Sequence, residues 1–254
     1  MKNNRYLTFA RFYAALTSNI SYSERAKYLK SIINDLFPAA EILLDLACGT
    51  GSLSIELDKL GFDVIAVDAS EAMLSELYDK KIENSADNIL VLCQKMQELD
   101  LYGTVDVTVC ALDSVNHITD KNILQTAFDK VSLFTVPGGL FIFDANTVYK
   151  HRNILADNTF VYDLDDVYCV WQNSLNPDDN TVSMDIDFFY PDESSGSSAY
   201  FRASDTISEK AYSVDELSDM LKKSGFEIVN IFGDYNFSAP AENEERVVFV
   251  ARKV

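Results

Sequence analysis

A carboxylate beside a glycine-rich turn is the first feature of this 254-residue sequence that could do chemistry. Asp45 lies in a short apolar run, residues 42–46, and Cys48-Gly49-Thr50-Gly51 follows it. Glycine lets the backbone turn tightly and lets a ligand approach without a Cβ in the way. Apolar residues then recur with helical spacing, so a helix N-terminus with free N–H groups should lie beside the turn. The stretch predicts a strand, a turn and a helix around a polar ligand.

The neighbouring residues narrow the class of ligand. Ser54 stands where a dinucleotide fingerprint has its third glycine, and no Lys follows Gly51 as it would in a phosphate-binding P-loop. Asp45 would repel phosphate but suits an ammonium group. Asp68 ends the next apolar run, 19 residues past Gly49, where a carboxylate can accept from both ribose hydroxyls. These residues describe a site for S-adenosylmethionine (SAM), and a dinucleotide-binding domain with a degenerate loop is the alternative.

Four motifs then follow in a recognisable order: DLACGTG at residues 45–51, VDASEAML at 67–74, LDSVNH at 112–117 and PGGLFIFD at 137–144. In this order they resemble the class I SAM-dependent methyltransferases. The resemblance spans most of residues 40–145. It implies a Rossmann-like α/β fold, with a doubly wound seven-stranded sheet that is mostly parallel and has an antiparallel last strand. It also implies an enzyme that transfers a methyl group from SAM to an N or O atom of a small-molecule acceptor.

The resemblance implies a set of cofactor-binding residues as well. The glycine turn would hold the methionine part and Asp68 the ribose. The family commonly has an acid where this chain has Lys95, and a Lys cannot accept from the adenine N6 amine. We therefore expect the Gln94 amide oxygen to accept from the N6 amine instead, and the Met96 backbone N–H to donate to adenine N1. The expected cofactor-binding residues are Asp45, Ala47, Cys48, Gly49, Gly51, Asp68, Ala69, Met73, Gln94, Lys95, Met96, Leu112 and Asp113.

His117 is the candidate catalytic residue. It lies in the segment after the predicted fourth strand, and ligands of open α/β sheets bind beyond the carboxyl ends of strands. Imidazole exchanges a proton near neutral pH, so His117 can serve as a general base; a structural His at a helix start is the alternative. Tyr13, Tyr22 and Asn116 are the expected acceptor-binding residues, and the aromatic pair can equally be ordinary packing. We expect no metal ion.

The remaining elements must bring these residues to one edge of a sheet. Residues 1–38 are amphipathic and aromatic, and they predict an N-terminal helical cap. Residues 145–206 form strand-like runs of alternating acidic and apolar residues, which predict a small antiparallel β insert as a wall or lid on the acceptor side. We expect one domain over residues 1–254. The predicted strands of the main sheet are 42–46, 64–67, 89–93, 105–110, 140–143, 226–232 and 246–251, and the predicted turns are 137–139, 176–180 and 194–198.

Composition excludes several classes of partner. The formal charge is −19, from 40 acidic and 21 basic residues, and such a field repels nucleic-acid phosphates and anionic lipid. No stretch reaches the roughly 20 apolar residues of a membrane span, and no signal peptide is evident. Four Cys without metal-ligand spacing predict reduced thiols and a cytoplasmic protein.

Other functions and assembly states stay open at this stage. We expect a monomer or a homodimer. A SAM-binding protein without transferase activity, with a regulatory or structural role, is one alternative function. A protein or RNA methyltransferase is the other, although the chain lacks an Asn-Pro-Pro-Tyr type tetrapeptide after the fourth strand.

Overall fold

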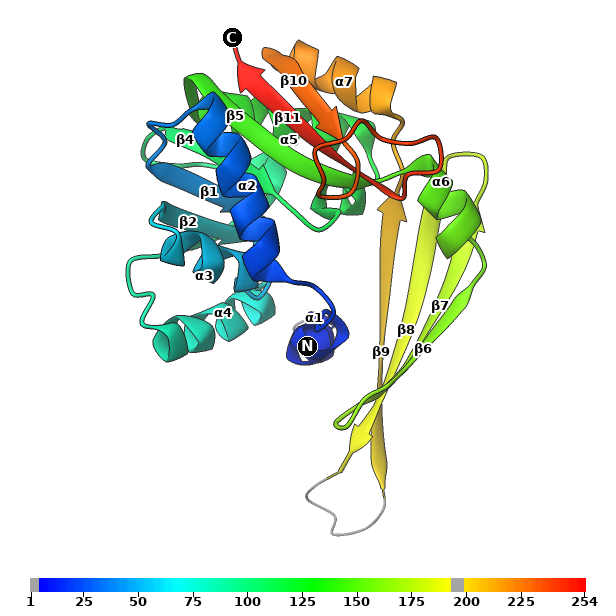
Figure 1. Ribbon diagram of the computed structural model, residues 1–254. Coiled ribbons are helices and arrows are strands. Elements are labelled where there is room, and N and C mark those ends of the chain that lie inside the picture. Colours follow the sequence, from blue (N-terminus) through cyan, green and yellow to red (C-terminus); the bar gives the residue numbers. More distant parts are fainter. Residues whose placement is uncertain (1–4, 193–198) are drawn as a thin grey trace.

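The computed structural model describes residues 5–192 and 199–254. Its larger sheet has seven strands in the order β10-β11-β5-β4-β1-β2-β3 (Figure 1). β11 runs antiparallel to both neighbours, and the other neighbouring pairs are parallel. This confirms the predicted fold class. The strands are β1 (Ile42–Leu46), β2 (Asp63–Asp68), β3 (Leu90–Cys93), β4 (Val105–Cys110), β5 (Thr135–Asn146), β10 (Phe226–Phe232) and β11 (Arg246–Lys253).

Helices cover both faces of this sheet. On one face α2, α3 and α4 pack on Leu43 and Val107, and on the other α5 and α7 pack on Leu44 and Phe141. Because both faces are buried, the central strands read as nearly continuous apolar runs. The helical elements are α1 (Arg5–Leu16), α2 (Tyr22–Leu36), α3 (Ser52–Lys59), α4 (Glu71–Asn84), α5 (Lys121–Phe134) and α7 (Val214–Lys223), with the short segments η1 (Met96–Glu98), η2 (Ser114–His117), α6 (Val148–Lys150) and η3 (His151–Leu155). Among the described residues no helix is long and apolar enough to cross a membrane.

Side-chain caps fix the starts of two helices. Ser70 accepts from the Met73 N–H at the start of α4, and Ser213 with Glu216 forms a capping box at the start of α7. The turn expected at residues 137–139 lies inside β5 instead. There β5 pairs with β4 on both sides of a register shift, which lets the Pro-Gly-Gly residues bulge without ending the strand.

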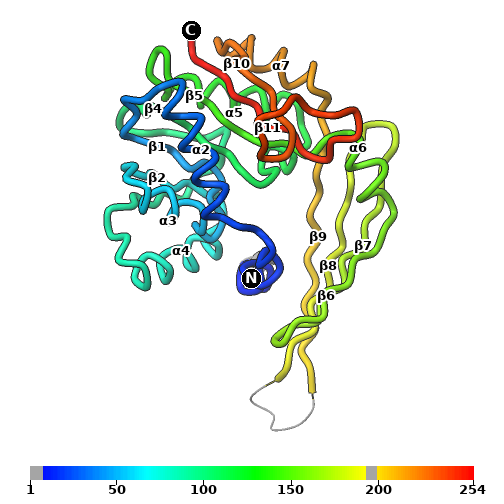
Figure 2. The backbone as a smooth tube through the Cα atoms, in the orientation of Figure 1, coloured from blue at the N-terminus to red at the C-terminus, as the bar shows by residue number. Residues whose placement is uncertain are grey.

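The insert is a separate four-stranded antiparallel sheet in the order β6-β7-β8-β9. The backbone trace in Figure 2 shows the chain leaving the main sheet after β5, building this sheet and returning at α7. Most of this sheet lies within the predicted residues 145–206, and β9 continues past them to Lys210. The serine turn predicted at 194–198 falls outside the described residues, as do the first four residues of the predicted cap. The strands are β6 (Thr159–Asp163), β7 (Tyr168–Asn176), β8 (Thr181–Pro191) and β9 (Tyr200–Lys210).

The first helix joins the two sheets. In Figure 1, α1 lies between α4 and β9, and it contacts both. Phe9 and Phe12 pack on Phe188 of β8, and the same cluster includes Met73 of α4. The N-terminal cap therefore closes the space between the main sheet and the insert, on the side where the strands β1, β2 and β4 end.

Candidate active site

A cavity of about 650 Å³ lies at the carboxyl ends of β1 to β4. The cap contributes Phe9 and Tyr13 to its wall, and the insert contributes Ile207. A smaller cavity of about 30 Å³ adjoins it around the glycine turn. Of the predicted cofactor residues, Ala47, Gly49, Asp68, Ala69, Met73, Gln94, Lys95, Met96 and Leu112 line the large cavity, and Asp45, Ala47, Cys48, Gly49 and Leu112 line the small one.

Asp68 ties the glycine turn to the next helix. Its Oδ2 accepts from the Gly49 N–H at 2.9 Å, and its Oδ1 accepts from the Ser70 N–H at 2.8 Å. Burial raises the pKa of Asp68, and the two backbone N–H groups partly offset this effect. Each carboxylate oxygen accepts more than one hydrogen bond, so both remain able to accept from ligand hydroxyls.

Asp45 is the buried carboxylate of the small cavity. It is 2% exposed, and its Oδ2 accepts from the Ser54 hydroxyl at 2.5 Å. Burial raises the pKa of Asp45 to about 7, against the partial stabilisation that Ser54 gives to the charged form. A cationic group beside Asp45 would lower this raised pKa, so the carboxyl would be ionised when the cation is bound.

The turn after β4 has an unusual backbone that Asp144 holds in place. Leu112 and Asp113 are consecutive left-handed residues, with φ of +58° and +52°, a conformation that costs a non-glycine residue about 1–3 kcal/mol. The buried Asp144 carboxylate accepts from both of their N–H groups, at 2.8 and 2.6 Å. Tyr235 also donates to Asp144, and Arg246 pairs with it. This network places Leu112 at the boundary between the two cavities.

Asp113 faces Arg246 rather than either cavity. Burial would raise the pKa of Asp113, but Arg246, 2.7 Å from Oδ1, together with Lys150 and His117 holds it well below its ordinary value. The predicted cofactor contact of Asp113 is therefore replaced by an ion pair.

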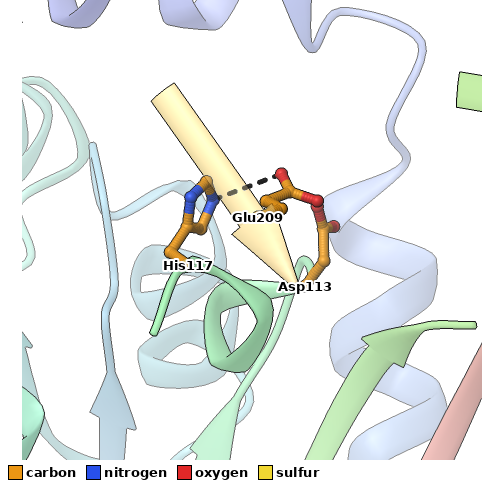
Figure 3. Close-up of side chains that lie close together, drawn as sticks. All are labelled: Asp113, His117 and Glu209. Carbon is orange, nitrogen blue, oxygen red and sulfur yellow. Dashed lines mark ion pairs between the residues drawn. The ribbon is translucent and has the colours of Figure 1, made fainter. Parts of the chain in front are cut away.

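His117 lines the large cavity at the end of η2, as predicted, and its side chain is 44% exposed. Its Nε2 lies 3.6 Å from Oε1 of Glu209, a residue of β9 that sequence reasoning missed (Figure 3). The second Glu209 oxygen lies 3.6 Å from Nε2 of His151 and accepts from the Asn146 amide at 3.1 Å. The available signal for Glu209 was its inward position on an alternating strand, shared with Ile207.

The Gln94 side chain is committed to its own loop. Its amide oxygen accepts from the Asp100 N–H at 2.9 Å, and its amide nitrogen donates to the Asp100 carbonyl at 3.0 Å. The Gln94 oxygen, which borders the large cavity, therefore already has one partner, and its second lone pair is what remains for the adenine N6 amine. Lys95 pairs with Glu98 at 3.0 Å, also at the rim.

Asn116 has a structural role instead of the predicted acceptor contact. It is fully buried and lines neither cavity. Its amide nitrogen donates to the Asn146 and Lys210 carbonyls, and its amide oxygen accepts from the Asn146 N–H. Tyr22 lines the small cavity beside Asp45, away from the expected acceptor side, whereas Tyr13 lines both cavities. Asn116 thus connects η2 to β5 and to β9 of the insert.

Gly51 is required for packing rather than for ligand approach. Its φ is +72°, and a Cβ there would lie 2.1 Å from Cδ1 of Leu77 in α4. It lines neither cavity, in contrast to Gly49, whose φ is +55°.

Comparison with known proteins decides the family. Residues 43–139 match a family model described as "Methyltransferase domain". A Bacillus subtilis protein named "Putative methyltransferase YqeM" is 32% identical over 98% of this chain and 97% of its own length. The crystal structure of a SAM-dependent methyltransferase from Clostridium acetobutylicum is 31% identical, covers 98% of both chains and superposes with a TM-score of 0.85.

The chain belongs to the class I SAM-dependent methyltransferases. It is an enzyme, and its cofactor is SAM. A SAM-bound amino pentose methyltransferase from Micromonospora echinaspora shares the fold with a TM-score of 0.74, at 17% identity and 95% coverage of both chains. A mouse glycine N-methyltransferase is 34% identical over 123 residues, which cover 44% of this chain and 40% of the mouse protein's length. The alternatives of a dinucleotide-binding domain and of a SAM-binding protein without activity are thereby set aside.

The residues present fit the cofactor of this methyltransferase. Asp45 offers a buried carboxyl without a cationic partner among its described contacts, and its pKa of about 7 lets it ionise beside an ammonium group. Asp68 keeps acceptor capacity for two hydroxyls. The large cavity has the apolar Met73 and Met96 in its wall, which suits an adenine ring.

A metal ion fits the site less well. Asp113, His117 and Glu209 offer ligand atoms within 4.8 Å of one another (Figure 3). The two Asp113 oxygens already contact the Arg246 guanidinium and the Asn146 amide. A cation there would have to displace or sit beside the guanidinium, which is electrostatically unfavourable.

Proposed function

We propose that this methyltransferase transfers the methyl group of SAM to the nitrogen of a small-molecule amine. The observation that carries the proposal is that His117 lines the cavity together with Asp68 and Leu112, and that the buried Glu209 carboxylate lies 3.6 Å from the His117 Nε2. An acceptor amine is cationic at neutral pH, and a buried carboxylate attracts it. An overall charge of −19 favours the same class of acceptor.

Each half of the cofactor has a proposed partner. Asp45 would take the ammonium group, the turn from Ala47 to Gly49 the rest of the methionine part, and Asp68 the ribose hydroxyls. Adenine would lie between Met73 and Met96. This places the sulfonium methyl near the boundary of the two cavities, where Tyr13 and Leu112 lie.

The chemistry asked of the acceptor side is positioning and removal of a proton. Displacement at the methyl carbon requires the nucleophile in line with the departing sulfur, at roughly 3–3.5 Å. An ammonium group has no lone pair, so a base must take its proton before attack. His117 lies at the cavity wall to do so. The cap and the insert contribute Tyr13 and Ile207 to the wall around the reacting atoms.

Relatives support an amine acceptor. The glycine N-methyltransferase and the amino pentose methyltransferase described above both carry amine acceptors in their names. We also propose a cytoplasmic location, because Cys48, Cys93, Cys110 and Cys169 are all unpaired thiols.

Release of S-adenosylhomocysteine tests the proposed acceptor class. A panel would pair each small amine, amino sugars and amino acids included, with its hydroxyl analogue, and would add a protein extract and RNA. We expect turnover with one or more amines and none with the matched alcohols. Turnover with a hydroxyl analogue alone, or with protein or RNA alone, would overturn the amine proposal.

A further inference from the structure

Glu209 lies between the two histidines of the chain. One carboxylate oxygen faces Nε2 of His117 and the other faces Nε2 of His151, each at 3.6 Å. Glu209 is 5% exposed and His151 is fully buried. A buried carboxylate with an imidazole on each oxygen is costly unless protons lie between the groups. The arrangement therefore constrains where the imidazole protons are.

The contacts of His151 fix its tautomer. Its Nδ1 lies 2.9 Å from the Asn180 carbonyl oxygen, which can only accept, so Nδ1 carries a proton. Its Nε2 is buried without a hydrogen-bond partner and faces Glu209. With the Nδ1 proton used on Asn180, the described donor that reaches this side of Glu209 is the Asn146 amide, 3.1 Å from Oε2. The Asn146 amide thus holds Glu209 from one side.

We propose that Glu209 is a positioning residue for His117, directing the His117 Nε2–H toward its carboxylate and leaving Nδ1 to accept the proton of the acceptor amine. The proton step rests on the function proposed above. The proton passes from the acceptor nitrogen to His117 Nδ1 and then to solvent, which the half-exposed ring contacts. The N–C bond forms as the C–S bond breaks, and S-adenosylhomocysteine leaves. A separation of 3.6 Å is longer than a hydrogen bond, but such contacts often tighten only when substrate binds.

Other charged groups surround this pair, and any test must separate their effects. Asp68 lines the same cavity, and His117 acts to lower the pKa of Asp68 against the effect of burial. Asp113 precedes His117 on the same turn and is paired with Arg246 of β11. Lys150 of α6 donates to the Asn146 side chain. The Glu209→Gln substitution itself alters none of these groups.

Titration of the imidazole signals by NMR tests the pairing without SAM or acceptor. The two histidines give two sets of signals, and His117→Asn assigns them. After EDTA treatment, we expect Glu209→Gln to move the His117 titration midpoint down by about 0.5–1 pH unit, since a lost opposite charge within 4–6 Å acts in that direction. Glu209→Asp should restore most of the shift. Asp205→Asn, which removes a buried carboxylate from the same face of β9, should leave the midpoint unchanged.

Kinetics then connect the pairing to the reaction. With an acceptor found in the panel above, Glu209→Gln should lower kcat about tenfold or more, move the acidic limb of the kcat profile to lower pH, and leave SAM affinity unchanged. An unchanged His117 midpoint in Glu209→Gln, or an equal shift in Asp205→Asn, would overturn the positioning role. A shifted midpoint with no methyl transfer to any amine would leave the pairing intact and refute the proposed function instead.

Discussion

Replacing Asp45 by Asn tests how the methyltransferase binds the charged end of SAM. The Asp45 carboxyl is 2% exposed, accepts only a hydroxyl hydrogen bond among its described contacts, and has a pKa raised by burial to about 7. An ammonium group beside it would ionise it. Below pH 7, SAM binding must then release a proton from Asp45, so the observed affinity should rise with pH.

The size of this effect follows from the pKa. If SAM binds only the ionised form, affinity rises on the order of tenfold between about pH 5.5 and pH 7 and then levels off. In the Asp45→Asn variant the rise disappears, and the affinity at pH 7 falls by roughly ten- to a hundredfold, as expected for a lost charge-assisted contact of about 1.5–3 kcal/mol. Calorimetry in two buffers of different ionisation enthalpy counts the released protons.

Without SAM, the contribution of Asp45 to stability should change with pH in the opposite direction to SAM affinity. The folded pKa of Asp45 is above its unfolded value of 3.8, so the folded state binds more protons between pH 3.8 and about 7. Its contribution to the free energy of unfolding therefore falls as pH rises through this window. At pH 8 without SAM, Asp45→Asn should raise Tm, while Ser54→Ala should not. A lower Tm of Asp45→Asn at pH 8, or a SAM affinity of the wild type that does not change with pH, would refute the argument from the buried carboxyl.

The remaining predictions concern three other side chains. Asp68→Ala should weaken SAM binding by about ten- to a hundredfold, since it removes the proposed ribose acceptor and unpairs two backbone N–H groups. Calorimetry measures this loss, with Asp63→Asn as an exposed control on the same strand. Gln94→Leu should lower the free energy of unfolding by about 1 kcal/mol through its lost bonds to Asp100, with SAM affinity changed less than threefold; a large loss of affinity at unchanged Tm would return adenine recognition to Gln94. His117→Asn should lower kcat by roughly 10²–10⁴ at unchanged SAM affinity, and full kcat in the variant would reduce the site to proximity alone.

The sequence predicted which residues come together at the ends of neighbouring strands. Gly49 follows β1 and Asp68 ends β2, and these two strands pair in parallel, so both residues line the same cavity. The doubly wound sheet was predictable for the same reason, since each strand and helix carries its own periodicity. The individual strands of the insert were less predictable: β6 has Phe160, Val161 and Tyr162 in a row, which shows no alternation of polar and apolar residues.

What sequence reasoning could not reach were the partners that come from distant parts of the chain. Asn116 looked available because its backbone partners, Asn146 and Lys210, are 30 and 94 residues away, and only the folded insert brings them to it. Gln94 looked available because a loop that closes on its own side chain leaves no periodic signal. A polar residue in a motif can be judged free for a ligand only after every buried backbone group near it has been satisfied.

The same long-range contacts explain why the acceptor side depends on the insert. Asp144 belongs to the last predicted motif, yet its carboxylate holds the Leu112 turn at the cofactor boundary, and Arg246 of the final strand neutralises it. Asn116 and Glu209 connect the following turn to β9. A change in the insert that moves β9 would therefore shift His117 while leaving the Asp45 and Asp68 contacts unchanged. We therefore expect cofactor binding and acceptor turnover to be separable, because different strands hold the two proposed halves of the site.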